Sequence, residues 1–251
     1  MNATETGRWQ TVLGWLAEST AADHASMLRT LYEPLCRPRG DGLVVAHLAQ
    51  SLDGRIATHT GVSQWLSGGE DLLHTHRMRA LFDAVVVGAN TVLHDDPQLT
   101  VRRCAGSNPV RVVIDPQRRL DGAQRVFRDE RAPTLVLVSE DAPGRDASIG
   151  QAEIVRLPAA GGAFDPIDIR RTLAERGLMR LFIEGGGITV SRFLAARALD
   201  RLQITVAGVI VGSGRPGLVL PEISHLRDSL RPRTRRFAFG EDVMFECDFD
   251  A

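Results

Sequence analysis

The sequence predicts an α/β fold with a mixed, mostly parallel central sheet, helices on both faces and antiparallel strands at the C-terminal end. One observation is the alternation, from residue 43 onward, of short apolar runs with stretches of helical period. A second is that runs such as "DAVVVG" are continuously apolar, as is typical of strands that a parallel sheet buries on both faces. The third is "RTRRFAFGEDVMFECDF", which predicts a hairpin around Gly240.

Residues 1–40 are expected to form a helical N-terminal appendage, and residues 41–251 the main domain. Apolar side chains recur at helical spacing in the first stretch, at Trp9, Val12, Leu13 and Leu16. A second short helix is expected over 23–31, after which "EPLCRPRGDG" interrupts the pattern with prolines and glycines. We expect a helical hairpin that packs on the main domain or on a partner.

The main domain begins with "LVVAHLAQSL", which predicts a strand, and "EDLLHTHRMRALF" then predicts a helix. One face of this helix is expected to carry Leu72, Leu73, His76 and Leu81. Further strands are expected at "DAVVVG", "VRVVID", "TLVLVS" and "LMRLFIEGG", with helices near 166–176 and 189–198. The run "DRLQITVAGVIVG" then leads into the C-terminal hairpin.

The composition excludes several kinds of chemistry. All 30 basic residues are arginine, so no lysine is present for a Schiff base, a P-loop clamp or a lysine general base. The formal net charge of −1 gives no preference for nucleic acid or an anionic membrane, and we expect neither as a partner. Cys36, Cys104 and Cys247 lie too far apart for a Cys-x-x-Cys zinc site. No apolar run approaches the roughly 20 residues of a membrane span, and no leader is evident, which predicts a soluble cytoplasmic protein.

The stretch "FIEGGGITVSRFL" places Gly185, Gly186 and Gly187 between a strand and a helix. Without Cβ atoms these residues let a ligand approach the backbone, and their N–H groups favour an anion together with the helix N-terminus. A tight turn is the alternative, but such a turn seldom needs three glycines. Glu184 ends the strand, where open α/β sheets place their ligands, so we expect a ligand contact there.

The stretch "VVVGANTVLHDDPQLTVR" predicts a buried strand and then a short helix that Asn90 or Thr91 can cap. Asp95 and Asp96 stop this helix before Pro97. Paired carboxylates can bind a metal, but they also accept backbone N–H bonds in a turn. The turn is the simpler explanation, and we expect no metal site.

Arginines follow two of the expected strands. Arg102 or Arg103, beside a ligand cleft, is suited to clamp a phosphate. Arg118 and Arg119 follow "VVIDP", where they can hold an adenosine 2′-phosphate or simply lie in an exposed loop. The sequence leaves both alternatives open.

Several longer motifs occur in a fixed order. They are Ser-Leu-Asp-Gly-Arg-Ile-Ala at Ser51–Ala57, Gly-x-Ser-x-Trp at Gly61–Trp65, His-Arg-x-Arg-Ala at His76–Ala80, the long run Val87–Arg102, Glu-Gly-Gly at Glu184, Asp-Arg-Leu at Asp200 and Gly-x-Gly at Gly212. Over about residues 43–250, this order resembles the pyrimidine reductases of riboflavin biosynthesis. These reductases occur alone or as half of a bifunctional deaminase–reductase, and their fold is like that of dihydrofolate reductase.

The resemblance implies that NADPH reduces the phosphoribosylamino group of a 5-amino-uracil to a ribitylamino chain, by direct hydride transfer to C1′ of the sugar. It implies substrate contacts at Ser63, Arg79, Leu99, Arg102 and Glu184. It implies cofactor contacts at Gln50, Trp65, Thr91, Asp95, Gly185, Gly186, Gly187, Ile188 and Thr189. A homodimer is also implied. The residue types agree with these roles, because arginines suit a sugar phosphate and Trp65 offers a flat face to a nicotinamide.

One position departs from the family pattern. His47 stands where the family usually has a lysine that contacts the substrate, and we expect a partly protonated histidine contact there. The departure leaves the exact substrate open, and two other functions stay open beside the pathway reductase. One is a reductase of the same fold that acts on a pteridine or another heterocycle, and the other is a nucleotide-binding protein without turnover.

Overall fold

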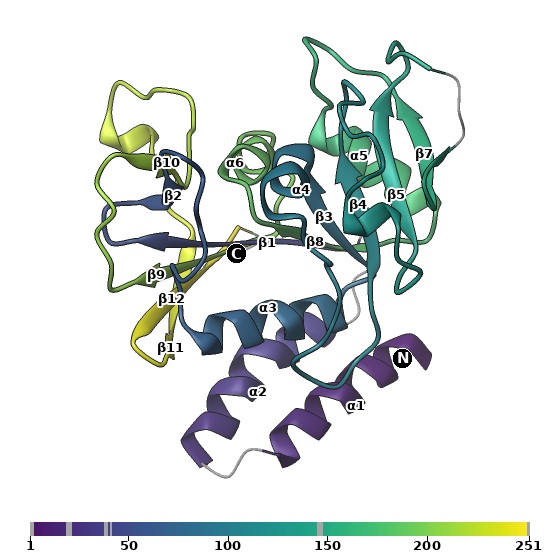
Figure 1. The fold of residues 1–251 in the computed structure, drawn as a ribbon. Helices are drawn as coiled ribbons and strands as arrows, with labels where there is room; N and C mark the ends of the chain where they lie inside the picture. The colour runs from purple at the N-terminus through teal and green to yellow at the C-terminus, as the bar shows by residue number, and fades with distance from the viewer. Residues whose placement is uncertain (1–2, 19–21, 38–39, 41, 145–147, 250–251) are drawn as a thin grey trace.

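The computed structural model describes residues 3–18, 22–37, 40, 42–144 and 148–249. Their centre is a ten-stranded sheet with the strand order β11-β12-β9-β1-β8-β3-β4-β5-β7-β6 (Figure 1). The strands are β1 (Leu43–Ser51), β3 (Ala84–Gly88), β4 (Val110–Ile114), β5 (Thr134–Ser139), β6 (Ser148–Ile149), β7 (Ala152–Leu157), β8 (Arg180–Glu184), β9 (Arg201–Ala207), β11 (Arg233–Phe239) and β12 (Asp242–Asp248). A separate two-stranded sheet joins β2 (Arg55–Thr58) to β10 (Gly214–Pro216).

The central strands run parallel and the outer ones do not. From β9 through β1, β8, β3, β4 and β5 to β7 every neighbouring pair is parallel, whereas β6, β12 and β11 pair antiparallel. Val85 and Val87 face one core and Val86 faces the other, which explains why "DAVVVG" is apolar throughout. The predicted fold class, with antiparallel strands at the C-terminal end, is confirmed.

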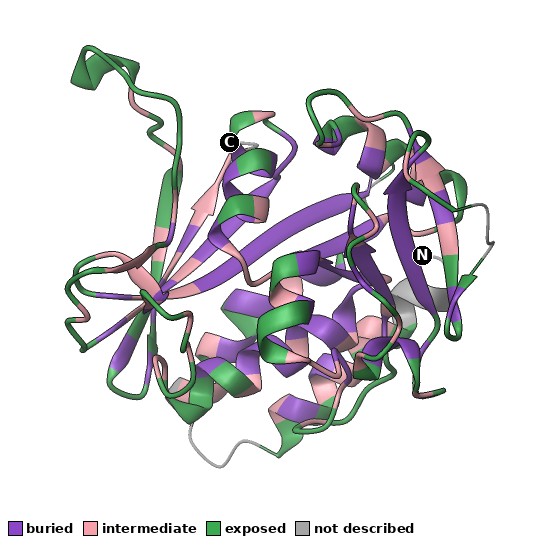
Figure 2. Cartoon of the chain, turned by 45° about the horizontal axis from the view of Figure 1, so that its top comes forward, coloured by how far each residue is buried: buried purple, intermediate pink, exposed green. Residues whose placement is uncertain are grey.

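Helices cover both faces of the sheet. They are α1 (Ala3–Ala17), α2 (Ala22–Cys36), α3 (Gly69–Leu81), α4 (Ala89–Asp95), α5 (Pro166–Glu175) and α6 (Gly187–Ala195), with 3₁₀ turns at Arg125–Phe127 and Leu226–Asp228. α3 lies against one face with α1 and α2 below it, while α5 and α6 lie on the other (Figure 1). Figure 2 shows the central strands as the most continuously buried part of the chain.

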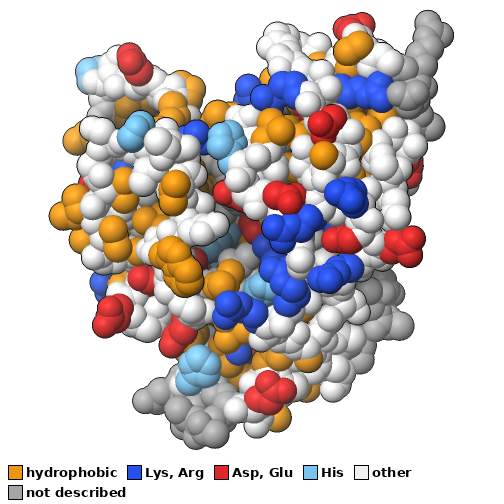
Figure 3. Space-filling model, in the orientation of Figure 1, with side chains coloured by type: hydrophobic (Ala, Val, Ile, Leu, Met, Phe, Trp, Pro, Cys, Tyr) orange, Lys and Arg blue, Asp and Glu red, His pale blue; other side chains and the backbone are white. Residues whose placement is uncertain are grey.

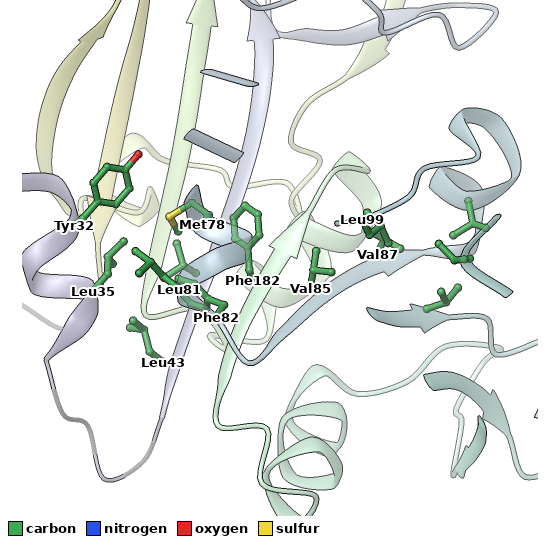
Figure 4. Packing of buried hydrophobic residues seen from close by; sticks show 14 of the residues in the cluster. Tyr32, Leu35, Leu43, Met78, Leu81, Phe82, Val85, Val87, Leu99 and Phe182 are labelled. Atoms are coloured by element: carbon green, nitrogen blue, oxygen red, sulfur yellow. The ribbon is translucent and has the colours of Figure 1, made fainter. Parts of the chain in front are cut away.

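The two N-terminal helices share the core beneath α3. Tyr32 and Leu35 of α2 are buried in one cluster with Met78 and Leu81 of α3 (Figure 4). In α1, Trp15 is 2 % exposed and belongs to the same cluster. The hairpin therefore packs on the sheet domain, which is one of the two placements expected.

α2 is longer than predicted because it continues through a proline. Pro34 has no N–H to donate to the carbonyl of Thr30, so a helix would normally break there. Nη1 of Arg235 donates to that carbonyl instead, at 3.1 Å. A side chain distant in the sequence thus supplies the missing donor.

α3 turns polar side chains toward the sheet. Of the residues expected on one face, His76 and Leu81 are buried, but Leu72 is 41 % exposed. Asp71, His74 and Arg79 are buried instead. Each finds hydrogen-bond partners on other elements, without which burying such groups would be costly.

One chain of hydrogen bonds links α2 to the sheet through His74. Nε2 of Gln203 donates to Glu246 at 3.0 Å, so the amide oxygen of Gln203 faces Nε2 of His74, 2.8 Å away. Nε2 must then carry the proton, and Nδ1 accepts from the hydroxyl of Tyr32 at 2.7 Å. Burial, more than any neighbouring charge, lowers the pKa of His74 to about 3 and raises that of Tyr32 above its ordinary value. The imidazole is therefore neutral and fixed in one tautomer.

Candidate functional site

The carboxyl ends of three central strands meet at one edge of the sheet. His47 of β1 is level with Glu184 of β8, and β3 lies on the other side of β8. The glycine loop, which we define as residues 185–187, leaves β8 at this edge, and α4 leaves β3 beside it. On the face shown in Figure 3, arginine side chains gather beside a hollow in the middle of the molecule. This is where open α/β sheets bind ligands.

The glycine loop needs residues without side chains because other segments approach its backbone closely. A Cβ atom on Gly187 would lie 2.2 Å from the carbonyl oxygen of Gly217, and one on Gly186 would lie 3.2 Å from Oγ1 of Thr91. Gly185 has a φ of +77°, which favours glycine. The loop leads into α6, whose first amide groups have no acceptor within the helix. These amides and the helix dipole suit a phosphate, and Thr91 lies directly beside them.

Gln50 and Thr189 lie around the same loop. A Cβ atom on Gly217 would lie 2.7 Å from Oε1 of Gln50, at the end of β1. One on Gly88, at the end of β3, would lie 2.8 Å from Oγ1 of Thr189. Ile188, in the first turn of α6, is 60 % exposed. The structure thus gathers Gln50, Thr91 and residues 185–189 around one point.

Three other expected contacts are partly or fully exposed. Trp65 is 93 % exposed and Ser63 is partly exposed, both in the loop between β2 and α3. Among the described residues, no hydrogen bond joins this loop to the glycine loop. Asp95 is exposed at the end of α4, where partial desolvation raises its pKa against the opposing charges of His94 and Arg215.

Arg79 and Glu184 form a bidentate ion pair. Nε of Arg79 donates to Oε2 of Glu184 at 2.8 Å, and Nη2 donates to Oε1. The third nitrogen, Nη1, donates to the carbonyl of Thr100 at 3.0 Å. The two side chains are 7 % and 17 % exposed, respectively. Because three of its five N–H donors are engaged, two of them by Glu184, Arg79 orients this carboxylate in the present conformation.

Arg102 is the exposed cation beside that pair. Its Nη1 donates to the hydroxyl of Thr100 at 2.7 Å and to the carbonyl of Thr100 at 3.3 Å. Its backbone N–H donates to Nδ1 of His76 at 3.0 Å. Desolvation, followed by the charges of Arg79 and Arg131, lowers the pKa of Arg102. A cation placed among other cations is favourable for binding an anion.

Two expected substrate contacts are buried. Nε2 of His47 lies 3.0 Å from Asp71 and 3.3 Å from the hydroxyl of Thr205, and His47 is only 4 % exposed. Burial alone would raise the pKa of Asp71, but His47 and the hydroxyls of Thr205 and Ser67 hold it below its ordinary range. This interior pairing is at odds with a histidine contact to the substrate. Leu99, at φ +53° and 1 % exposed, packs its side chain in the core, so only its main chain can face a ligand (Figure 4).

Asp53 has a role that the sequence motifs did not reveal. Its carboxylate accepts from the hydroxyl of Ser51 at 2.6 Å and from the amides of Val211 and Gly212 at 3.0 and 2.7 Å. These bonds, the one from Ser51 first, lower the pKa of Asp53 to about 2. Two motifs far apart in the sequence, around Asp53 and Gly212, are therefore joined. In the sequence, the only sign of this link is that both motifs are present.

The end of α4 and the arginines beyond it have structural partners. The N-cap position of α4 is Gly88, with no side-chain cap hydrogen bond, so the cap expected from Asn90 or Thr91 was wrong. Asp96 accepts from the amide and from Nε of Arg125, at 2.7 and 2.9 Å. Arg118 donates to the carbonyl of Pro143 at 2.8 Å and Arg119 donates to Asn90 at 2.9 Å.

Two kinds of feature are absent from the described residues. No group of three or more His, Cys, Asp or Glu side chains there is arranged to hold a metal ion. None of the described helices is both long and apolar enough to cross a membrane.

Comparison with known families and proteins gives consistent matches. A family model described as "RibD C-terminal domain" matches residues 43–236. The 2,5-diamino-6-ribosylamino-4(3H)-pyrimidinone 5′-phosphate reductase of Methanothermobacter thermautotrophicus is 38 % identical over an alignment of 210 residues that covers 81 % of this chain and 96 % of that protein. The riboflavin biosynthesis protein RibD of Aquifex aeolicus is 34 % identical over an alignment of 200 residues that covers 78 % of this chain but 54 % of that protein.

Solved structures show the same likeness. The deaminase/5-amino-6-(5-phosphoribosylamino)uracil reductase of Thermotoga maritima superposes with a TM-score of 0.68 at 29 % identity, covering 90 % of this chain and 61 % of that one. RibD of Acinetobacter baumannii gives a TM-score of 0.72 at 24 % identity over 89 % of this chain and 63 % of that one, which supports the fold alone. The chain thus spans less than two thirds of these two proteins and nearly all of the Methanothermobacter reductase.

Proposed function

Because the chain belongs to the RibD C-terminal domain family, we propose that it is an NADPH-dependent pyrimidine reductase of riboflavin biosynthesis. Its substrate carries a ribosylamino 5′-phosphate, and its product carries a ribitylamino chain. One observation carries the proposal: the Arg79–Glu184 pair and the exposed Arg102 lie at the strand end from which the glycine loop leaves. A carboxylate for hydroxyls and a cation for a phosphate thus lie beside a loop suited to a dinucleotide.

The glycine loop fits the pyrophosphate of such a cofactor. The first amide groups of α6 follow this loop directly, and the hydroxyl of Thr91 lies beside it. Bound NADPH supplies the hydride. We assign to its binding the residues Gln50, Trp65, Thr91, Asp95, Gly185, Gly186, Gly187, Ile188 and Thr189.

The residues of the chain orient the substrate for hydride transfer. Glu184, with both oxygens held by Arg79, keeps lone pairs that accept hydrogen bonds from sugar hydroxyls or from the pyrimidine. Arg102 binds the phosphate. In the open-chain imine form of the sugar, C1′ accepts the hydride and the imine nitrogen takes up one proton, which gives the secondary amine of the product. The acceleration comes from orientation and charge complementarity, and no residue has to form a covalent bond.

Two pyrimidines are candidates for the ring that carries the sugar. The archaeal relative, matched over almost its whole length, is named for a 2,5-diamino-pyrimidinone, whereas the Thermotoga protein is named for the 5-amino-uracil. We favour the diamino-pyrimidinone, since the identity to the archaeal reductase is higher and more complete.

The test follows NADPH absorbance with the purified protein and each of the two pyrimidine phosphates. We expect one of them to be reduced and a pteridine to be left unchanged. Arg102→Gln removes charge-assisted hydrogen bonds, so the KM for the pyrimidine should rise roughly tenfold or more. Arg103→Gln, a change of the neighbouring exposed arginine, is the matched control and should leave KM close to wild type. Turnover of neither pyrimidine, or equal effects of the two changes, would contradict the proposal.

A further inference from the structure

His76 belongs to the buried face of α3 and binds the segment that carries Arg102. It is 1 % exposed, and its Nδ1 accepts the backbone N–H of Arg102 at 3.0 Å. One turn along the same helix, Nη1 of Arg79 donates to the carbonyl of Thr100 at 3.0 Å. Two side chains on one face of α3 therefore hold an N–H and a carbonyl two residues apart. In a sheet, a neighbouring strand would form hydrogen bonds to such a carbonyl and N–H; here side chains of α3 form them.

The hydrogen bond to Arg102 fixes the state of the imidazole. Because Nδ1 accepts, the single proton of His76 must be on Nε2, and the ring is neutral. Burial, followed by the charges of Arg79 and Arg102, lowers the pKa of His76 to about 4. Glu184 opposes this shift and Arg103 adds to it, so cations dominate the surroundings. The acceptor is thus kept available at neutral pH.

The position of Arg102 decides how this edge of the sheet meets an anion. All three nitrogens of the Arg79 guanidinium are engaged by Glu184 and Thr100. The hydrogen bonds of the Arg102 side chain use Nη1, and within the described part of the chain none uses its Nε or Nη2. Arg102 therefore has donors left for a phosphate, and its backbone amide is the point at which α3 holds it.

We propose that His76 is a positioning residue: by accepting the amide hydrogen of Arg102 it sets the place of that guanidinium for the phosphate of the substrate. The inference rests on the proposed function for the identity of the ligand. It does not require His76 to touch the substrate, the cofactor or the reacting atoms. A hydrogen-bond acceptor at the position of Nδ1 is what matters.

The experiment compares three changes at one position. His76→Asn places an amide oxygen near the position of Nδ1, His76→Gln places its amide near the position of Nε2, and His76→Leu removes both polar atoms. Binding of ribose 5-phosphate, measured by calorimetry, reports on the phosphate site without turnover. We expect His76→Leu and His76→Gln to weaken this binding about tenfold, and His76→Asn to keep most of it.

Steady-state kinetics separates positioning from a general loss of structure. For His76→Leu, the KM for the pyrimidine phosphate should rise by the same factor, while kcat and the KM for NADPH stay near wild type. If His76→Leu does not fold, the comparison of His76→Asn with His76→Gln decides.

Three results would overturn the inference. The first is equal binding of ribose 5-phosphate by His76→Asn and His76→Gln, and the second is no binding of it by the wild type. The third is a KM of His76→Leu for the pyrimidine without its phosphate that rises as much as its KM for the pyrimidine phosphate. If the wild type binds ribose 5-phosphate but reduces neither pyrimidine, the proposed function fails while the role of His76 is still tested.

Discussion

Replacement of Arg79 tests the ion pair at the centre of the candidate site. Arg79→Met keeps most of the length of the side chain and removes its charge, which leaves the carboxylate of Glu184 without its partner. Breaking a buried pair costs about 3 to 5 kcal/mol, and since Glu184 is 17 % exposed the lower end applies. The lost hydrogen bond to the carbonyl of Thr100 adds about 1 kcal/mol. The free energy of unfolding should therefore fall by about 4 kcal/mol.

The matched changes are Glu184→Gln and the double variant. Glu184→Gln retains one amide oxygen for the guanidinium but leaves the charge of Arg79 uncompensated, so we expect a loss of about 2 to 3 kcal/mol. The double variant has no buried charge and should lose only about 2 kcal/mol, less than Arg79→Met alone. Urea unfolding followed by circular dichroism gives the three values, with an unchanged m-value as the check on two-state behaviour. A double variant whose loss equals the sum of the single losses would refute the reasoning.

Three further predictions concern other parts of the chain. His74 has a pKa of about 3 in the fold but an ordinary value when unfolded, so the unfolded state takes up the extra proton as pH falls. Its contribution is complete above pH about 6.5 and falls by about 2 kcal/mol between pH 7 and 5, so the loss of unfolding free energy over this range, measured by urea unfolding, should be smaller in His74→Gln by about that amount. Gly187→Ala should lower both Tm and NADPH affinity, because its Cβ would meet a backbone carbonyl, whereas Gly69→Ala, with open space around it, should change neither. Asp53→Ala removes the acceptor of two loop amides, so limited proteolysis should cut near Val211 faster than in wild type, and an unchanged cutting rate would argue against that anchor.

The sequence was most informative where a local pattern decides the structure. The strand from Ala84 to Gly88 was predictable because both of its faces are buried and every residue in it is apolar or small. The place of Glu184 at a strand end also followed, since the glycines after it stop the strand. Such features need only the residues themselves and their immediate neighbours in the chain.

Features that depend on distant partners were not predictable. The inward face of α3 carries Asp71 and His74 because β9 supplies Thr205 and Gln203, and no periodicity within the helix reveals those partners. His47 was expected to be an available cation because the sequence likewise does not reveal its partners Asp71 and Thr205. The strands β2 and β10 are short and about 160 residues apart, so neither shows a recognisable period by itself. β7 was missed as well, since its exposed Glu153 interrupts the apolar run.

The hydrogen-bond chain that begins at Tyr32 bears on whether the first two helices are a removable module. A truncated protein starting at residue 41 would lose the Tyr32 hydroxyl that donates to Nδ1 of His74. This nitrogen would then lack its donor on a face of α3 that also carries Met78 and Leu81. Either water would have to enter the core to donate to Nδ1, or the ring would have to rotate and lose its hydrogen bond to Gln203. The helical hairpin is therefore an integral part of the domain rather than a separable segment. Moving it to another protein would require a histidine at the matching position.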